Sequence, residues 1–240
     1  MSEGVLRAAA VGVSGPHRPL LADVFLEARP GRVLAVTGAS GSGKTTLLSV
    51  LGGLLRPDDG DATYDGQPVG NRSGEPRTGT AFVLQTYGLV PTLTAGENVA
   101  VALRARAVAP DEAVERSRLA LERVGVGDLA ERLVTELSGG QLQRVAVARA
   151  LAVEPDVLLA DEPTSELDEH NRDLVVAELR READRGCVVV LATHAPEVAD
   201  LCDDELHIVD GRPTGAAVRT VPTVEDGPEH VHDMFRRPGP

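Results

Sequence analysis

Gly-Ala-Ser-Gly-Ser-Gly-Lys-Thr-Thr, at residues 38–46, is the stretch that decides the fold of this chain. It follows an apolar run at 33–36 and leads into a second at 47–51, an order that predicts a strand, a glycine-rich loop and a helix. The spacing of its glycines and lysine matches the phosphate-binding pattern G-x-x-x-x-G-K-S/T. A glycine-rich turn with an incidental lysine would need neither flanking element. The sequence therefore favours a phosphate-binding loop.

The chemistry of this loop suits a nucleotide with a magnesium ion. Glycines let successive backbone N–H groups curl around an anion, and a helix that starts near Gly43 directs its positive end at the phosphates. Lys44 supplies a charge for the outer phosphates, and the Thr45 hydroxyl is placed to ligate Mg²⁺. We expect the whole loop to contact the nucleotide, through Gly38, Ala39, Ser40, Gly41, Ser42, Gly43, Lys44, Thr45 and Thr46.

Composition and charge limit the classes of function. A chain of 240 residues suits one large domain or two lobes that share a core. With 42% apolar but only 2% aromatic residues, the core must be built from valine, leucine and alanine. The net charge of −13 disfavours a protein that wraps nucleic acid or lies on anionic lipid. A phosphate loop is locally positive whatever the net charge.

The cysteines and the apolar runs bear on the compartment. Cys187 and Cys202 have no metal-ligand spacing and are expected to be free thiols in a reducing compartment. Residues 1–13 carry neither a basic segment nor a long apolar one, and the apolar run at 187–192 is too short to cross a bilayer. We therefore expect a cytosolic protein that reaches a membrane only through another polypeptide.

The pattern along the chain predicts an α/β core interrupted by a helical block. From residue 93 to 151 the apolar period changes from two to about 3.6, which predicts helices. Capping-box sequences at Thr94 and Ser138 open two helices, Pro110 opens a third, and Asp168 opens a fourth outside the block. The expected strands cover 5–13, 22–28, 33–36, 62–64, 81–84, 157–160, 187–193 and 206–209.

Two finer expectations concern surfaces and the end of the chain. In the helix from Pro110, a stripe of Val114, Leu121 and Val124 is expected to face the core. From residue 215 onward proline, glycine, glutamate and histidine dominate, so we expect 215–240 to be a loosely held tail. His230 and His232 could be read as a metal site, but an exposed polar tail is the better interpretation.

A second carboxylate site follows the strand expected at 157–160. Asp161 and Glu162 come directly after this apolar run. In phosphate-loop enzymes an acid at this place holds Mg²⁺ opposite the loop hydroxyl, and the adjacent acid can accept a proton from an attacking water. Two acids also occur where a buried strand re-enters solvent, but a preceding phosphate loop makes that interpretation the weaker one.

Five motifs together give the chain its resemblance to the ATP-binding subunit of ATP-binding cassette (ABC) transporters, over about residues 5–212. They are the phosphate loop, Gln85 at a strand end, the signature Leu-Ser-Gly-Gly-Gln at 137–141, the run Asp-Glu-Pro-Thr-Ser-Glu-Leu-Asp at 161–168, and His194. The resemblance implies a P-loop NTPase (RecA-like) α/β core with an antiparallel β subdomain and an inserted all-helical subdomain. It places the ATPase domain at 1–214, with the core and β subdomain at 1–85 and 152–214 and the helical subdomain at about 86–151.

The resemblance also implies a role for each motif residue. Thr45, Gln85 and Asp161 would hold Mg²⁺, with Gln85 also reaching the attacking water. Glu162 is the expected general base, and His194 would contact the γ-phosphate beside it, although a lone histidine at a strand end is more often structural. The signature residues expected to contact ATP are Ser138, Gly139, Gly140 and Gln141.

The signature motif predicts a dimer. Ser138 with the amides of Gly139 and Gly140 forms a second helix N-terminus able to bind phosphate, on a helical block that faces away from its own loop. The resemblance implies a head-to-tail homodimer, or a heterodimer with a related ATPase subunit, that encloses two ATP molecules. Residues 86–99 would carry the docking groove for a separate membrane permease. The sequence of these residues resembles that of the family branch that serves lipoprotein release, macrolide and peptide export, and cell division.

The chain departs from the family's pattern at three places. Most members stack an aromatic residue on adenine, at a position that falls near Ser14, yet none precedes Phe25. Either His17 stacks instead or the base is held loosely. Glu166 adds charge near the dimer interface where a small residue is usual, and Leu142 replaces a common glutamine.

The leading hypothesis is an ATP-hydrolysing subunit that powers a membrane transporter, and two other classes stay open. A soluble cassette ATPase for iron–sulfur assembly or DNA maintenance would need no membrane partner, although no long coiled-coil insertion or basic patch supports the DNA version. A nucleotide-sensing module without turnover would need no catalytic acid, whereas Glu162 and His194 are both present.

Overall fold

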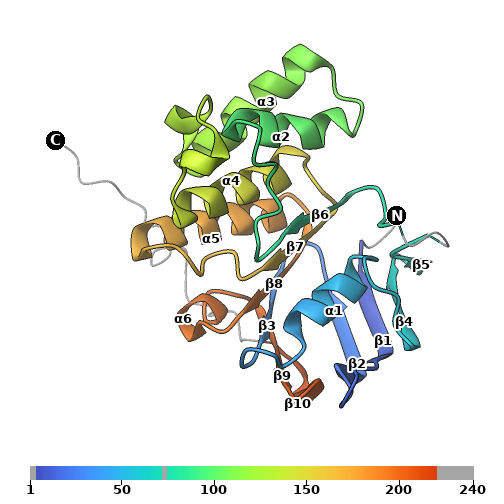
Figure 1. The fold of residues 1–240 in the computed structure, drawn as a ribbon. Coiled ribbons are helices and arrows are strands. Elements are labelled where there is room, and N and C mark those ends of the chain that lie inside the picture. Colours follow the sequence, from blue (N-terminus) through green and yellow to red (C-terminus); the bar gives the residue numbers. More distant parts are fainter. Residues whose placement is uncertain (1–3, 72–74, 221–240) are drawn as a thin grey trace.

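Two sheets and a group of helices make up the computed structural model, which describes residues 4–71 and 75–220 (Figure 1). A four-stranded antiparallel sheet has the order β2-β1-β4-β5, with β1 Leu6–Val13, β2 Leu21–Ala28, β4 Asp59–Tyr64 and β5 Gln67–Pro68. A six-stranded sheet has the order β10-β9-β3-β8-β7-β6. Its strands are β3 Val33–Thr37, β6 Thr80–Val83, β7 Val157–Asp161, β8 Val188–Thr193, β9 Asp204–Val209 and β10 Arg212–Thr220.

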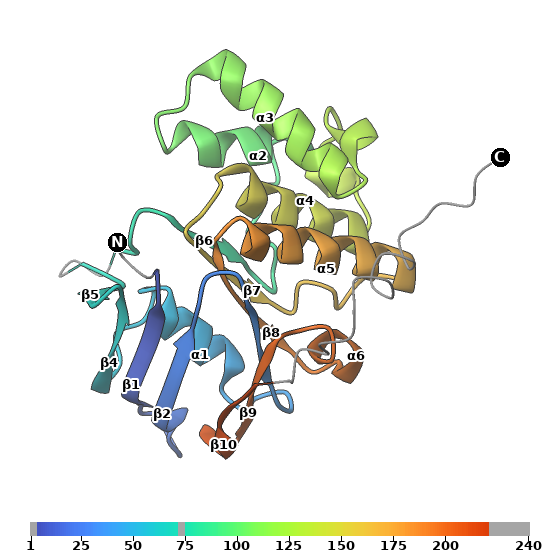
Figure 2. The same cartoon turned by 180° about the vertical axis from the view of Figure 1, so that it is seen from behind.

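The helices lie in two groups. Helix α1 (Lys44–Leu51) lies between the two sheets. Helices α2 (Ala95–Arg104), α3 (Pro110–Arg123) and α4 (Gly139–Ala152) form one lobe, with two short 3₁₀ turns at Gly127–Leu129 and Val134–Glu136. Helix α5 (Glu169–Asp184) lies beside α4, as the reverse view shows, and α6 (Pro196–Ala199) follows β8 (Figure 2). In the described part of the chain, none of the helices has both the length and the apolar character needed to cross a membrane.

The six-stranded sheet divides the hydrophobic core into two layers. On β7, Leu158 and Ala160 pack with the helical lobe, whereas Val157 and Leu159 pack with α1 and the antiparallel sheet. Successive side chains of a strand point to opposite faces, so a strand covered on both faces reads as a continuous apolar run. The largest fully buried side chains among the described residues are all leucines, which confirms the prediction of an aliphatic core.

Local sequence signals place several elements correctly. Thr94 and Ser138 each cap a helix through a complete capping box, and Asp168 caps α5 through the backbone N–H of Asn171. The expected turn at Asp65-Gly66 joins β4 to β5, with both residues at positive φ. The parallel strands at 33–36, 81–84, 157–160 and 187–193 are confirmed to within a residue or two at each end.

Three expectations about element placement are wrong. Val114 is 66% exposed, because the core-facing stripe of α3 runs through the smaller Ala113, Ser117 and Ala120 to Leu121. Strand β4 begins at Asp59 rather than at the expected residue 62, because Asp59 pairs with Gly12 of β1.

The third correction concerns the end of the chain. The irregular tail expected from 215 is wrong for 215–220, because β10 continues to Thr220 in antiparallel pairing with β9. The hairpin turns at Asp210-Gly211, both at positive φ, and its backbone pairing requires no apolar periodicity. The rest of the expected tail, with His230 and His232, lies outside the described residues.

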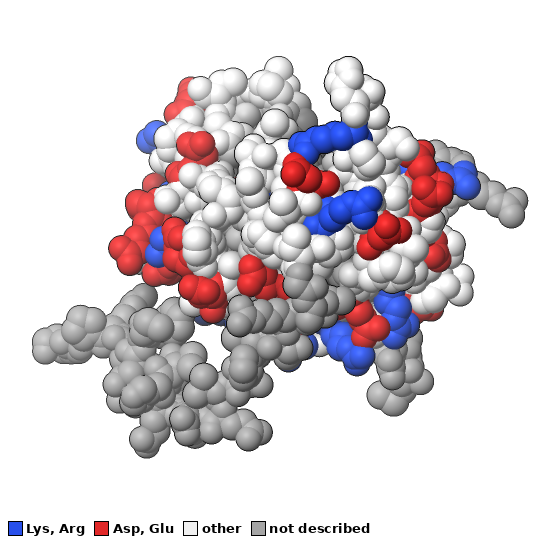
Figure 3. Space-filling model, turned by 90° about the horizontal axis from the view of Figure 1, so that it is seen from below, with Lys and Arg blue, Asp and Glu red and all other residues white. Residues whose placement is uncertain are grey.

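On the face of the molecule that carries the lower ends of the sheets, acidic and basic side chains lie interspersed among uncharged ones (Figure 3). Several charges of the described residues are paired, as between Arg7 and Glu27 at 2.8 Å and between Arg32 and Asp204 at 2.6 Å. On the face that Figure 3 shows, the basic side chains do not gather into one large basic field.

Candidate functional site

The carboxyl ends of four parallel strands meet at one edge of the six-stranded sheet. The glycine-rich loop follows β3, Gln85 follows β6, Asp161 ends β7 and His194 follows β8. Ligands of α/β proteins bind at this edge because it gathers loops and helix N-termini. A cavity of about 470 Å³ opens there, lined by Leu20, Ala39, Ser40, Gly41, Gly43, Lys44, Thr45, Thr46, Gln85, Asp161, Glu162, Ser165 and His194.

The glycines of the loop are required by its backbone. Gly38, Gly41 and Gly43 have φ of 145°, 75° and 113°, a region that residues with a Cβ rarely adopt. A Cβ on Gly38 would lie 2.2 Å from the carbonyl oxygen of Ile208, and one on Gly43 would lie 2.6 Å from that of Leu20. The loop can therefore curl under the cavity only with glycine at these places.

Lys44 is buried and braces the loop from inside. Its Nζ donates to the carbonyl oxygens of Gly38 at 2.8 Å and Ala39 at 3.2 Å, and lies 3.8 Å from Glu162 Oε1. The ammonium thus sits between the loop and the acids of β7. A positive charge at this point can attract a bound anion and offset the negative charge of the acids.

Thr45 and Asp161 join the loop to β7. The Thr45 hydroxyl donates to Asp161 Oδ2 at 2.6 Å, while the buried Oδ1 has no hydrogen-bond partner among the described residues. Burial raises the pKa of the Asp161 carboxyl, which the Thr45 hydrogen bond partly offsets, and the charge of Glu162 raises it further. A hydroxyl and a carboxylate with a free oxygen form a donor set that suits a hard cation such as Mg²⁺.

Glu162 and His194 contact each other in the lining of the cavity. His194 Nδ1 lies 2.8 Å from Glu162 Oε1, and the glutamate side chain is 9% exposed against 63% for the histidine. Glu162 has a left-handed backbone with φ of 50°, which is costly for a residue with a side chain. Its N–H donates to the Ala192 carbonyl at 2.9 Å, which ties it to β8.

Gln143 was not expected at the site, yet it holds the backbone of Glu162. This buried side chain of α4 donates from Nε2 to the Glu162 carbonyl at 2.5 Å, and its Oε1 accepts from the N–H of Glu166 at 2.9 Å. The side-chain amide of Gln143 therefore links α4 to Glu162 and to the loop that follows Glu162. In the sequence, Gln143 opens the run Gln-Arg-Val-Ala at 143–146 that follows the signature and belongs to the family resemblance, but this run does not identify the partner of its side chain.

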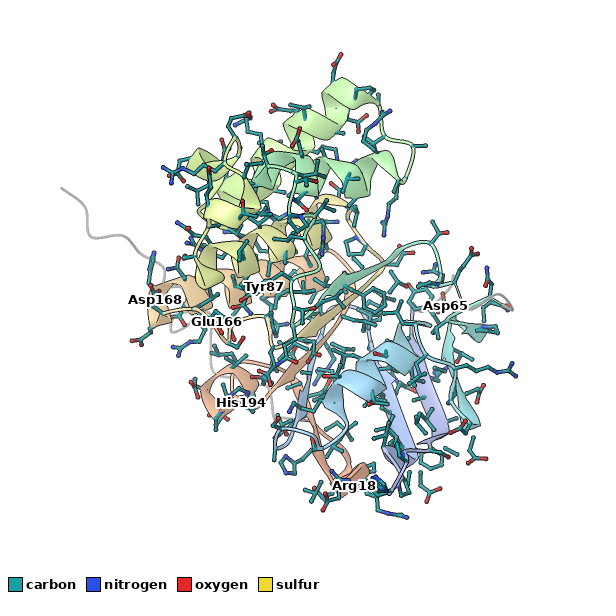
Figure 4. All side chains as sticks on the ribbon, in the orientation of Figure 1. Arg18, Asp65, Tyr87, Glu166, Asp168 and His194 are labelled. Atoms are coloured by element: carbon teal, nitrogen blue, oxygen red, sulfur yellow. The ribbon has the colours of Figure 1, made fainter. Side chains whose placement is uncertain are left out.

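The structure does not bring the signature together with the loop of the same chain. Ser138, Gly139, Gly140 and Gln141 begin α4 outside the set of cavity-lining residues. A Cβ on Gly139 would lie 3.1 Å from Glu166 Oε2 and 3.5 Å from the Tyr87 hydroxyl. Figure 4 accordingly shows Glu166 and Tyr87 near the start of this helix, above His194. Burial and the nearby Glu166 charge both raise the pKa of Tyr87.

Some of the other residues expected to contact the nucleotide line the cavity, and others do not. Gly38 and Ser42 do not line the cavity, because Gly38 lies beneath it and the Ser42 side chain is buried. His17 is exposed and also lies outside the lining, whereas Leu20, for which no role was expected, is part of it. These positions depend on how the β1–β2 loop packs against the phosphate loop, which is a long-range contact.

Comparison with known proteins agrees with the fold and the site. The family model described as "ABC transporter" matches residues 21–165. The lipoprotein-releasing system ATP-binding protein LolD of Bordetella pertussis is 41% identical over 82% of this chain and 89% of its own length. The macrolide export ATP-binding/permease protein MacB 1/2 of Paracoccus denitrificans is 39% identical over 94% of this chain, which spans about a third (33%) of that relative.

Solved structures give the same result. A dimeric post-hydrolysis structure of the ATP-binding cassette MJ0796, bound to ADP and Pi, superposes with a TM-score of 0.82 at 30% identity over 90% of this chain and 98% of that chain. The chain belongs to the ABC transporter family and corresponds to its ATP-binding part. The family resemblance and the P-loop fold predicted from the sequence are thereby confirmed.

Because the pKa of Asp161 is raised, its ionised carboxylate should lower the free energy of unfolding of the metal-free protein, and the size of this effect should depend on pH. A carboxyl whose folded pKa is raised binds its proton more tightly when folded, so its contribution to stability falls as pH rises through that pKa. Without nucleotide and with a chelator, Asp161→Asn should raise the unfolding temperature at pH 7, and the gain should shrink toward pH 4. Thermal unfolding followed by circular dichroism measures this.

The matched control is Asp23→Asn, the same change at a side chain that is 77% exposed. It should leave the unfolding temperature nearly unchanged at both pH values. An Asp161→Asn variant that is less stable than the wild type at pH 7 would show that the carboxylate charge stabilises the empty site, contrary to this account.

Proposed function

We propose that this chain binds and hydrolyses Mg-ATP and that ATP-driven closure of a dimer powers a separate membrane subunit. The observation that carries the proposal is the juxtaposition of the Thr45–Asp161 hydrogen bond with the Glu162–His194 contact at the mouth of one phosphate loop. Membership of the ABC transporter family supports it. The relatives described above are named for macrolide export and lipoprotein release, which favours a transporter over a soluble cassette ATPase.

Thr45, Asp161 and Gln85 would hold the magnesium ion. The unpartnered Oδ1 of Asp161 supports this assignment, because a buried carboxylate oxygen is stable only with a partner. When bound, Mg²⁺ neutralises charge on the outer phosphates. The loop amides from Gly38 to Thr46 and the Lys44 ammonium would hold the phosphates themselves.

Glu162 would act as the general base, with His194 beside it as a contact to the γ-phosphate. A base must reach the attacking water by a hydrogen bond, and Glu162 lies at the cavity surface with its carboxylate held by His194. The backbone bonds from Gln143 and to Ala192 fix the carboxylate's position. This arrangement is typical of turnover rather than of a passive nucleotide sensor.

The second half of each ATP site would come from a partner copy. Within one chain the signature residues lie away from the cavity, yet the N-terminus of α4 has free N–H groups suited to a phosphate. A head-to-tail pair with twofold symmetry would place Ser138 and Gly140 of one copy over the loop of the other. MJ0796, described as a dimeric cassette, supports a homodimer, and a related ATPase subunit could replace one copy.

Residues 86–99 would dock the membrane permease at the cytoplasmic face of the membrane. The fully buried Asn98 accepts from the Val90 N–H at 2.7 Å and donates to its carbonyl at 3.1 Å, and Arg149 of α4 donates to the Tyr87 carbonyl at 2.7 Å. These bonds fix the segment and leave Val90 41% exposed. A rigid segment between the helical lobe, proposed as 86–151, and the core can transmit motion of one to the other.

Replacement of the proposed base tests turnover. Glu162→Gln keeps the shape but cannot accept a proton, so phosphate release should fall by at least about 100-fold, the usual contribution of a general base. ATP binding should persist, and the variant should accumulate as an ATP-bound dimer in size-exclusion chromatography with light scattering. Lys44→Ala is the companion variant and should lose ATP binding altogether. Unchanged phosphate release by Glu162→Gln would disprove the assigned role.

Affinity purification of the tagged chain from detergent-solubilised membranes tests the transporter assignment. An integral-membrane protein should co-purify, and Val90→Asp should release it by placing a charge in the docking segment. Val101→Asp, a similarly exposed valine at 45%, is the matched control and should retain the partner. Recovery of this chain without any membrane protein, or equal retention by both variants, would contradict the docking proposal.

A further inference from the structure

Polar and ionisable side chains line one end of the cavity. Glu162, His194 and Gln85 line the side where the outer phosphate would be attacked. On the other flank the lining includes Leu20, from the loop between β1 and β2. Figure 4 shows Arg18 of the same loop near the β2 and β10 end of the molecule, well away from His194. With the outer phosphate at the Glu162 end, as proposed above, the nucleoside end of a bound nucleotide would leave the phosphate loop on this flank.

The β1–β2 loop packs tightly against the phosphate loop. The Leu20 carbonyl lies 2.6 Å from where a Cβ on Gly43 would be, and equally close to one on Gly211. Arg18 Nη2 donates to the carbonyl oxygen of Gly41 at 3.2 Å, and Nη1 pairs with Asp210. Two contacts therefore hold the guanidinium at the rim of the phosphate loop, although 55% of the side chain is exposed.

We propose that Arg18 and Leu20 form the surface on which the nucleobase stacks. This inference rests on the proposed binding of a nucleoside triphosphate. No phenylalanine, tyrosine or tryptophan occurs in the chain before Phe25, so the imidazole of His17 is the only aromatic ring that the β1–β2 loop carries. A guanidinium is planar and delocalised and stacks on aromatic faces, and an adjacent leucine adds apolar contact. Neither Arg18 nor His17 lines the cavity itself, but Arg18 is held against the cavity-lining Gly41 by its hydrogen bond to that carbonyl.

Stacking on a guanidinium has a consequence for specificity. Every nucleobase offers a π face, and stacking alone reads none of the hydrogen-bonding groups on the base edge. The Arg18 donors near the loop are already directed to Gly41 and Asp210. The chain should therefore bind ATP and GTP with affinities that differ by no more than a few-fold.

Titration calorimetry of the full-length chain with Mg-ATP, Mg-GTP and Mg-tripolyphosphate tests the proposal, because the third ligand has the phosphates without a base. Arg18→Ala should weaken ATP and GTP by about 5- to 100-fold, the range for loss of one stacked base, and leave tripolyphosphate unchanged. Arg18→Lys keeps the charge but not the plane and should lose affinity similarly. Arg18→Tyr supplies an aromatic ring and should bind ATP more tightly than Arg18→Ala does.

Arg29→Ala is the matched control, since Arg29 is also an ion-paired surface arginine with 58% exposure, and it should change none of the affinities. Thermal unfolding checks that each variant is folded. Equal losses for ATP and tripolyphosphate would overturn the proposal in favour of a phosphate contact, and no loss for any ligand would overturn it outright. A wild-type chain that binds none of the three ligands would instead refute the proposed nucleotide function itself.

Discussion

The hydrogen bond between the Thr45 hydroxyl and the Asp161 carboxylate, 2.6 Å long, is the contact on which the site depends. It requires two segments 116 residues apart to end at the same height on one edge of a sheet. Strand β8 sets that height: Thr37 of β3 pairs with its Thr193, and Asp161 of β7 pairs with its Ala192. A shift of register on either side of β8 would separate the phosphate loop from the acid that faces it.

Much of this arrangement can be predicted from short-range patterns in the sequence. The loop glycines, the acids after an apolar run and the caps at Thr94 and Ser138 are short-range patterns with a physical cause at each position, and the structure has them where they are expected. Of the expected stripe, Leu121 and Val124 are buried, but Val114 is exposed because the buried face of α3 runs beside it through Ala113, Ser117 and Ala120. Strand β10 was not predicted because the sequence after the Asp210-Gly211 turn has no strand periodicity.

The contacts that could not be predicted are those between distant segments. Nothing near Gln143 indicates that its amide will bind the carbonyl of Glu162, and nothing near Arg18 indicates Gly41 as its acceptor. Both are polar side chains whose partners are fixed only when the loops fold against the sheet. A sequence pattern places Gln143 directly after the signature, but it gives the contact partner of neither side chain.

The signature residues lie at the start of α4, outside the lining of the cavity formed by the phosphate loop of the same chain. Gln143 joins the signature helix to the backbone of Glu162 and to Glu166, so a force on the start of α4 reaches the proposed base through one amide. In a head-to-tail dimer that force would come from the partner's nucleotide. Under the proposed dimer, each chain would hold half of each site and the connection between the halves.

Disulfide trapping between two chains, each with one introduced cysteine, tests this central claim most directly. The native Cys187 and Cys202 are buried, and burial raises the pKa of each thiol to about 12, so neither should compete in the oxidation. A mixture of Ser40→Cys and Ser138→Cys chains, each also carrying Glu162→Gln, should form a cross-linked dimer with Mg-ATP and little without it. Cross-linking that ignores ATP, or that forms within one chain carrying both cysteines rather than between chains, would contradict a site shared by two copies.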